Sequence, residues 1–245
     1  MTDKFVRIFG VRIDRVDMEE AFNRFVGLLN RERTAVIYTP NTEMVMAAEA
    51  DRDFREVLNS ADLVIPDGIG LVYASRIHHL GLTSRVPGIE LMERILKYSH
   101  TTRRSIFFFG GKPGTAELAV QRILEKYPNI VVKGIEHGYY TPEDEGRIID
   151  AINEAKPDVL FVALGAPKQE KWIAEHRRTL NAHVAMGVGG CFDVYAGNVK
   201  RAPVLFQRLG LEWFYRLMKE PSRIGRMMAL PRFMFKVITT RNISG

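Results

Sequence analysis

The stretch SIFFFGGKPG, residues 105–114, decides the fold. Its first half is an almost uninterrupted apolar run, which is typical of a β-strand covered on both faces. Its second half is glycine-rich, like a turn between a strand and a helix, where small residues let an anion approach the helix N–H groups. The stretch therefore predicts a buried parallel strand followed by a loop that can accept a phosphate.

The same pattern continues along the chain on both sides of this stretch. Short apolar runs alternate with amphipathic segments, and a hairpin is predicted ahead of them over residues 5–16. The predicted strands cover residues 35–38, 63–65, 105–109, 130–135, 159–164 and 184–188. The sequence thus predicts a Rossmann-like α/β fold, with a mostly parallel sheet flanked by helices.

Charge divides the chain into two parts. After Gly190 the pattern becomes helical, basic and methionine-rich. Residues 198–245 carry a net charge of +8, whereas the whole chain carries +6, so the preceding residues are slightly negative. We place the boundary near residue 195 and expect an α/β catalytic domain over residues 1–195 and a helical basic appendage over residues 196–245. Such a charge distribution indicates a polyanionic partner, either nucleic acid, an anionic membrane or a phosphorylated substrate.

Composition excludes several classes of protein. A hydrophobic fraction of 46% with 26% charged residues is that of a globular chain. The single cysteine, Cys191, excludes a disulfide-stapled module and a zinc ribbon, and we expect it to be a small buried apolar group. No apolar run reaches the ~20 residues that a membrane-spanning helix needs.

Polar, glycine-rich segments follow five of the predicted strands. In an open α/β sheet, ligands bind beyond the carboxyl ends of the strands. Each segment alone is explained by a turn or a helix cap, but five on one edge predict a ligand site. Gly110 and Gly111 belong to a segment that has the form of a phosphate loop between a strand and a helix. Because the GxGxxG pattern and the Walker motif are both missing, a nucleotide diphosphate is favoured over NAD as its ligand.

Asp67 is the sharpest single candidate. It follows a strand between Pro66 and Gly68, which hold it rigidly, and a positioned aspartate can act as a general base. The alternative is that Asp67 caps a helix that begins near Ile69. Both interpretations stay open at this point.

A metal site is not expected. Asp51 and Asp53 form a DxD pair, but they lie within a helix-like stretch, residues 44–58, whereas hard cations need several converging oxygen ligands. The six histidines lack metal-ligand spacing. We therefore predict neither a metal nor a cofactor.

The basic tail places Arg216 and Arg223 on one predicted helical face, with large apolar residues opposite. Such a helix suits the surface of an anionic membrane, and its arginines can also clamp a diphosphate. Single-stranded nucleic acid is the rival ligand, although the Met-, Leu- and Ile-rich composition favours lipid.

Read in order, these segments resemble the WecG/TagA/CpsF glycosyltransferase family, and within it the TagA-like branch. One departure is Glu90, where an aspartate is expected. The stretches that carry the resemblance are residues 39–43 (TPNTE), 66–70 (PDGIG), 85–90 (RVPGIE), 109–114 (FGGKPG), 164–172 (LGAPKQEKW), 187–201 (GVGGCFDVYAGNVKR) and 211–223 (LEWFYRLMKEPSR).

The resemblance implies inverting transfer of N-acetylmannosamine from UDP-ManNAc to the 4-hydroxyl of undecaprenyl-diphosphate-linked GlcNAc, a step in wall teichoic acid synthesis. The missing strand-end DxD and the lack of histidine ligands predict that this transfer is metal-independent. It implies a peripheral protein at the cytoplasmic face of a bacterial membrane, with a UDP-sugar, a lipid-linked acceptor and an anionic membrane surface as partners. Nucleic acid is not expected as a partner, and a homo-oligomer is left open.

The resemblance also assigns roles to residues. Asp67 and Thr39 would be catalytic, and the appendage would bind the membrane and close the site. The residues expected to bind substrate are Asn41, Arg85, Gly110, Gly111, Gln169, Arg216 and Arg223. Two alternatives stand beside this function: a Rossmann-type nucleotide-binding oxidoreductase, and a nucleic-acid-binding module that uses the basic tail.

Overall fold

The computed structural model describes residues 4–208, 210–219, 225 and 228–244. The strands are β1 (Phe5–Ile8), β2 (Val11–Asp14), β3 (Ala35–Tyr38), β4 (Leu63–Val64), β5 (Ser105–Gly110), β6 (Val131–Glu136), β7 (Val159–Ala163) and β8 (Val184–Gly187). The helices are α1 (Met18–Leu28), α2 (Thr42–Ala50), α3 (Arg52–Asn59), α4 (Ile69–Ile77), α5 (Gly88–Thr102), α6 (Thr115–Lys126), α7 (Pro142–Ala155), α8 (Lys168–His176), α9 (Cys191–Tyr195), α10 (Val204–Arg208), α11 (Glu212–Lys219) and α13 (Ala229–Thr239).

Six strands form one sheet in the order β4-β3-β8-β7-β5-β6, and every neighbouring pair is parallel. The predicted α/β fold is confirmed, and the observed ends of these six strands lie within one residue of the predicted ones. β1 and β2 form the predicted hairpin as a separate antiparallel pair. From β4 at one edge, the chain crosses through α5 to the other half of the sheet, so the direction of winding reverses, as it does at the ligand crevices of such folds.

Both faces of the sheet are covered, as the apolar runs predict. Along β5, Ile106 and Phe108 pack into one core with α1, α5, α6 and α9. The alternate residues Phe107 and Phe109 pack into the other core with α2, α3, α7, α8 and α13. All four side chains are at most 2% exposed, because successive side chains of a strand point to opposite faces.

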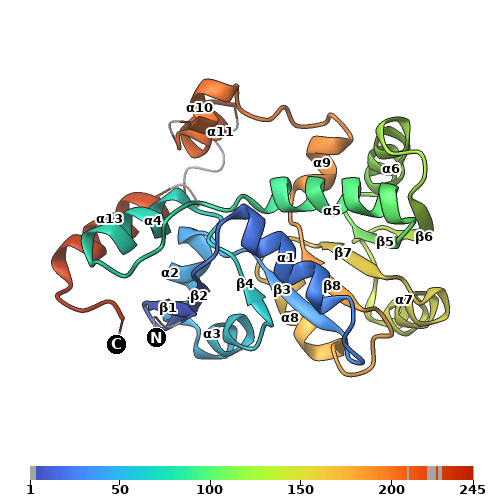
Figure 1. The fold of residues 1–245 in the computed structure, drawn as a ribbon, viewed down its shortest axis with the longest axis horizontal. Helices are drawn as coiled ribbons and strands as arrows, with labels where there is room; N and C mark the ends of the chain where they lie inside the picture. The colour runs from blue at the N-terminus through green and yellow to red at the C-terminus, as the bar shows by residue number, and fades with distance from the viewer. Residues whose placement is uncertain (1–3, 209, 220–224, 226–227, 245) are drawn as a thin grey trace.

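The C-terminal segment divides into two parts (Figure 1). Helix α13 packs against α2 and α4, where Phe233 and Val237 are fully buried. Just beyond it, Ile243 accepts a backbone hydrogen bond from Phe9 of the first hairpin at 2.9 Å. The short helices α10 and α11 instead pack on one another at a distance from α13. The described part of the tail thus includes a core helix as well as an outlying helical pair.

None of the helices in the described ranges is long and apolar enough to cross a membrane.

Candidate active site

The loops after β3 and β4 bring Thr39, Asn41 and Asp67 to one end of the carboxyl edge. The Asp67 N–H donates to the Pro40 carbonyl oxygen at 3.2 Å, which ties the two loops together. Their approach requires a glycine, because a Cβ at Gly68 would lie 3.1 Å from the Asn41 Cα. The side-chain oxygen of Asn41 accepts from the Met44 N–H at 3.0 Å, so this residue caps α2.

The start of α5 closes the same end of the edge. A Cβ at Gly88 would lie 3.2 Å from the Thr39 Cγ2, so Thr39 packs directly on this helix. The Val86 N–H donates to the Pro66 carbonyl oxygen at 2.8 Å, which places the neighbouring Arg85 beside Asp67. The structure therefore gathers four of the predicted site residues, Thr39, Asn41, Asp67 and Arg85, at one place.

Arg85 holds Asp67 by two contacts. Its Nε donates to the Asp67 backbone oxygen, and its Nη2 lies 3.4 Å from the Asp67 Oδ1. The N-cap position of α4 is occupied by Gly68, so Asp67 is not the N-cap residue that the alternative interpretation made it. Its side chain is 28% exposed and can meet a ligand that enters from solvent.

The Arg85 guanidinium also reaches the tail. Its Nη1 donates to the Oε2 of Glu212, the first residue of α11. The other Glu212 oxygen accepts from the Arg201 Nε at 3.4 Å, and the Arg201 Nη2 donates to the Glu90 Oε1 at 2.5 Å. Burial by itself lowers the pKa of Arg85, but Asp67 and Glu212 raise it above its ordinary value, so this arginine is firmly charged.

The glycine loop after β5 is shaped by its neighbour β7. Gly110 has a φ of +127°, and a Cβ there would lie 2.4 Å from the Ala163 carbonyl oxygen. The Gly111 N–H donates to that same oxygen at 2.9 Å, and its own φ is +74°. Only glycine fits at position 110, where two backbones approach closely, and the loop then continues through Lys112 and Pro113 to α6.

Gln169 and Glu170 are buried beneath the loop after β8. The Gln169 Oε1 accepts from the Gly189 N–H at 3.0 Å, and its Nε2 donates to the Glu170 Oε1 at 2.7 Å. Burial raises the pKa of Glu170 to about 7, although the hydrogen bond from Gln169 works in the opposite direction. Gln169 is only 3% exposed, so its amide supports the loop from below.

Three further residues considered in the sequence analysis are not placed at the carboxyl edge by the structure. Arg223 lies outside the described residues, and Arg216 belongs to α11 with its side chain undescribed. Cys191 is buried in the core, as predicted.

The DxD pair serves the fold. Asp51 breaks the helix predicted over residues 44–58 into α2 and α3, because its side chain caps α3 by accepting from the Phe54 N–H at 2.9 Å. It also pairs with Lys171 at 2.9 Å. Across the described ranges, no group of three or more His, Cys, Asp or Glu side chains is arranged to hold a metal ion.

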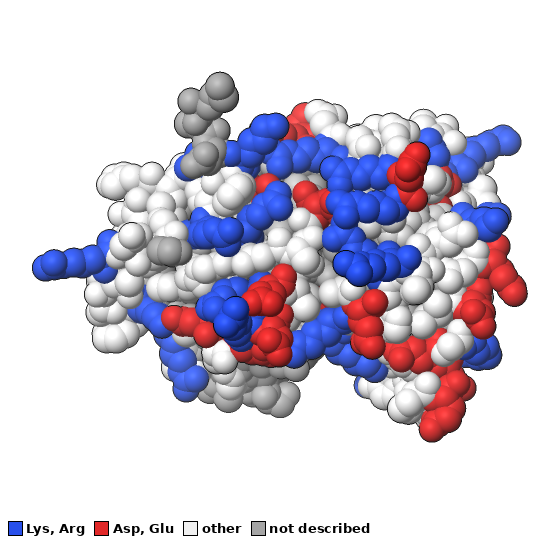
Figure 2. All heavy atoms as spheres, turned by 90° about the horizontal axis from the view of Figure 1, so that it is seen from below, with Lys and Arg blue, Asp and Glu red and all other residues white. Residues whose placement is uncertain are grey.

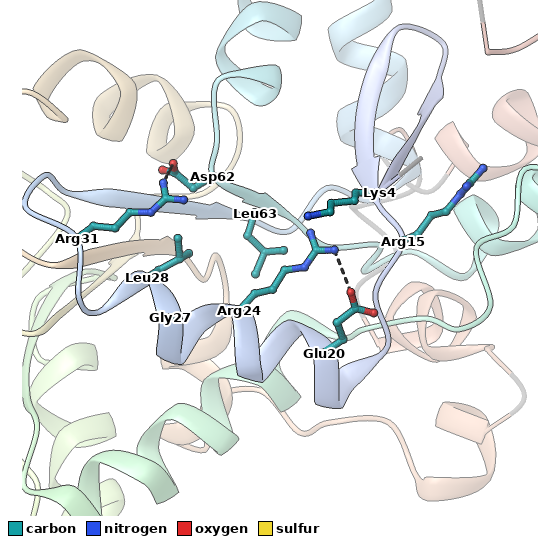
Figure 3. A pocket seen from close by; sticks show the side chains of 9 residues that line it. All are labelled: Lys4, Arg15, Glu20, Arg24, Gly27, Leu28, Arg31, Asp62 and Leu63. Atoms are coloured by element: carbon teal, nitrogen blue, oxygen red, sulfur yellow. Dashed lines mark hydrogen bonds and ion pairs between the residues drawn. The ribbon is translucent and has the colours of Figure 1, made fainter. Parts of the chain in front are cut away.

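A pocket of about 660 Å³ lies at the opposite end of β4 (Figure 3). Four cations, Lys4, Arg15, Arg24 and Arg31, line it with two carboxylates. Arg24 pairs with Glu20 at 2.9 Å, and Arg31 pairs with Asp62. On the face seen in Figure 2, basic and acidic side chains are likewise interspersed. Because two of its arginines are paired with carboxylates and Asp67 lies beyond the other end of β4, we do not take this pocket as the candidate active site.

Two acidic residues near the site, Glu170 and Glu212, were not predicted from the sequence. Glu170 could have been found from the helix period, since Trp172 and Ile173 face the core and place Glu170 on the same side of α8. Glu212 has only a weak signal, as one of two acids in a tail of +8.

A parallel sheet that carries an aspartate–arginine pair and a glycine-rich loop at its carboxyl edge has the features of an α/β enzyme that binds its ligand there. Sequence comparison specifies the class, because residues 6–244 match the glycosyl transferase WecG/TagA/CpsF family. The chain belongs to this family and is a glycosyltransferase.

Two relatives carry the same name, N-acetylglucosaminyldiphosphoundecaprenol N-acetyl-beta-D-mannosaminyltransferase. The protein of Bacillus subtilis (strain 168) is 42% identical over 204 residues, which are 83% of this chain and 79% of the relative. The protein of Staphylococcus aureus (strain MW2) is 38% identical over 234 residues, which are 95% and 91% of the two chains. The comparisons lend no support to an oxidoreductase or a nucleic-acid-binding module.

Proposed function

We propose that this chain transfers N-acetylmannosamine from UDP-ManNAc to the 4-hydroxyl of GlcNAc on undecaprenyl diphosphate, with inversion at the anomeric carbon. The names of the relatives support the two sugars and the lipid carrier. The observation that carries the proposal is the Asp67–Arg85 pair, which is partly exposed to solvent at the carboxyl edge of the sheet.

In this mechanism Asp67 is the general base. It accepts the proton of the acceptor 4-hydroxyl as that oxygen bonds to the anomeric carbon of the donor and the bond from that carbon to the UDP oxygen breaks. A single displacement opposite the leaving group inverts the anomeric centre. Thr39 belongs to the loop that is hydrogen-bonded to Asp67 through Pro40, and it would orient the acceptor sugar or the base.

The departing UDP carries the developing negative charge. Arg85 supplies a fixed positive charge beside the base, and the start of α6, which follows the loop of Gly110 and Gly111, would offer backbone N–H groups to the diphosphate. Arg216 and Arg223 would add positive charge from the tail. Asn41 and Gln169 would complete the donor site, Gln169 by supporting the loop at Gly189.

A lipid acceptor and a water-soluble donor can meet only at a membrane surface, and we place the protein peripherally at the cytoplasmic face. Exposed apolar side chains on the tail support this placement, since Leu205 on α10, Met218 on α11 and Phe235 on α13 are between 51% and 70% exposed. Together with the +8 charge of residues 198–245, they would bind an anionic bilayer.

The test is a transfer reaction scored by mass. The full chain is incubated with a panel of UDP-sugars and a soluble GlcNAc-diphosphate-lipid analogue, and we expect one N-acetylhexosamine to be added from UDP-ManNAc. Transfer from another UDP-sugar alone would reassign the donor. Failure with every donor, together with NAD(P) binding or a salt-sensitive shift of a labelled oligonucleotide, would replace the proposed function by an alternative.

A further inference from the structure

Glu212 occupies an unusual place for an acidic residue of the tail. Its side chain is only 10% exposed, although it begins the outlying helix α11. It lies between two arginines, accepting from Arg85 through one oxygen and from Arg201 through the other. A carboxylate that is withdrawn from water in this way must be compensated by its partners, so the site ties the tail to the edge of the sheet.

Arg85 is divided between two carboxylates that are far apart in sequence. One Nη group is directed at Glu212 and the other lies 3.4 Å from the Asp67 Oδ1, a long contact for a charged hydrogen bond. Without Glu212, the Arg85 Nη1 loses its partner, so the guanidinium can turn about the Nε bond to the Asp67 backbone oxygen and bring Nη2 into a short bond with the Asp67 carboxylate. A base paired in that way is a weaker base, because the arginine stabilises its charged form.

We propose that Glu212 is a positioning residue: by holding one side of the Arg85 guanidinium, it keeps Arg85 from closing onto Asp67 and leaves that carboxylate available to the acceptor hydroxyl. The inference rests on the proposed function, in which Asp67 is the base. It assigns to α11 a role separate from membrane contact, because the tail supplies the group that sets the strength of the base.

The charges around this pair set the sign of the expected effect. In the described ion pairs, Asp67 meets Arg85, Arg85 meets Glu212, Glu212 meets Arg201, and Arg201 meets Glu90. Removing the negative charge of Glu212 leaves the two arginines less compensated, so their net field favours the charged form of Asp67. The acid limb of the pH profile therefore moves to lower pH, and the rate on the plateau falls.

The experiment measures kcat/KM against pH for the full-length wild type and for Glu212→Gln, which keeps the shape of the side chain. It uses the soluble acceptor analogue and whichever UDP-sugar the wild type transfers. We expect the acid limb to shift down by about one pH unit and the plateau to fall by about 3- to 10-fold. Glu212→Asp retains the charge and should bring the limb back towards its wild-type position.

The matched control is Glu143→Gln, which also removes a carboxylate from the first turn of a helix, at an exposed place on α7. This variant should leave both limb and plateau unchanged, and thermal unfolding verifies that each variant is folded. A lower rate of folded Glu212→Gln at every pH with an unshifted limb would refute the inference and reduce Glu212 to a docking contact. An unchanged profile would refute it as well.

The two proposals fail differently. If the wild type transfers no sugar from any donor, the proposed function fails and the inference with it. If the wild type is active and the limb does not move in Glu212→Gln, the inference alone fails.

Discussion

The carboxyl edge of the sheet holds a carboxylate at each of two places, and their surroundings differ. Beyond β4, Asp67 is 28% exposed and stands against the charged Arg85. Beyond β7, Glu170 is 1% exposed, its nearest polar partner is a neutral amide, and burial raises its pKa to about 7. Two acidic residues that follow strands of the sheet thus receive different chemistry from their environment, one suited to proton transfer with a ligand and the other to support of a loop.

The largest effect should come from Asp67→Asn. It keeps the size of the side chain but removes the base, so turnover should fall by roughly 10² to 10⁴ while donor binding is largely retained. Turnover is measured by transfer to the soluble acceptor, and UDP binding is measured by calorimetry. Asp53→Asn, at an exposed position of α3, is the control. A near-normal rate in folded Asp67→Asn would erase the distinction between the two carboxylates.

Glu170 should act on stability in a pH-dependent way. Its pKa is raised from 4.5 to about 7 in the folded protein, so the folded state holds a proton that the unfolded state releases between these values. Stability from this group is complete below the lower value and is lost as pH rises through the upper one. Glu170→Gln should be more stable than wild type at pH 8 by up to about 3 kcal/mol and similar at pH 4.

Denaturant unfolding at several pH values measures this difference, and turnover serves as the second readout. Turnover of Glu170→Gln should stay close to wild type, because the amide can still accept the bond from Gln169. A loss comparable to that of Asp67→Asn would show that the buried carboxyl group takes part in the reaction after all.

Gly187→Ala tests how tightly the loop after β8 is supported. A Cβ there would lie 2.8 Å from the Gln169 Nε2, and that amide is fixed by its bond to Gly189. We expect a loss of about 1–3 kcal/mol in unfolding free energy, since the buried amide cannot move aside freely. Gly146→Ala is the control, because Gly146 is an exposed position of helix α7 where a Cβ would meet nothing within 4 Å, and the substitution should stabilise slightly. Equal effects of the two substitutions would mean that the loop tolerates displacement.

Asp51→Ala should have the smallest effect. It removes the cap of α3, so unfolding free energy should fall by about 1 kcal/mol with turnover unchanged.

Chelation by EDTA should leave the rate of the wild type unchanged as well. Loss of activity on chelation, restored by Mn²⁺ and absent in Asp51→Ala, would move the chemistry to the DxD pair.

The sequence predicts the sheet well because periodicity and strand-end loops are local signals. The six strands and the gathering of Thr39, Asn41 and Asp67 follow from residues close together in the chain or from the rule for parallel strands. The contact between Arg85 and Glu212 spans 127 residues, and no local pattern encodes it. The burial of α13 is also beyond periodicity, because an apolar stripe shows that a helix packs without showing on which partner.

The position of Phe233, Val237 and Ile243 in the core has a consequence for synthesis of the protein. These residues complete the packing around the first hairpin, yet they are synthesised after every strand of the sheet. The strands of the first hairpin are made early, and part of their apolar surface stays exposed until Phe233, Val237 and Ile243 have been synthesised. Nascent chains are therefore open to chaperones until α13 has been made, and a stop codon ahead of α13 would release a product whose core lacks the side chains of this helix.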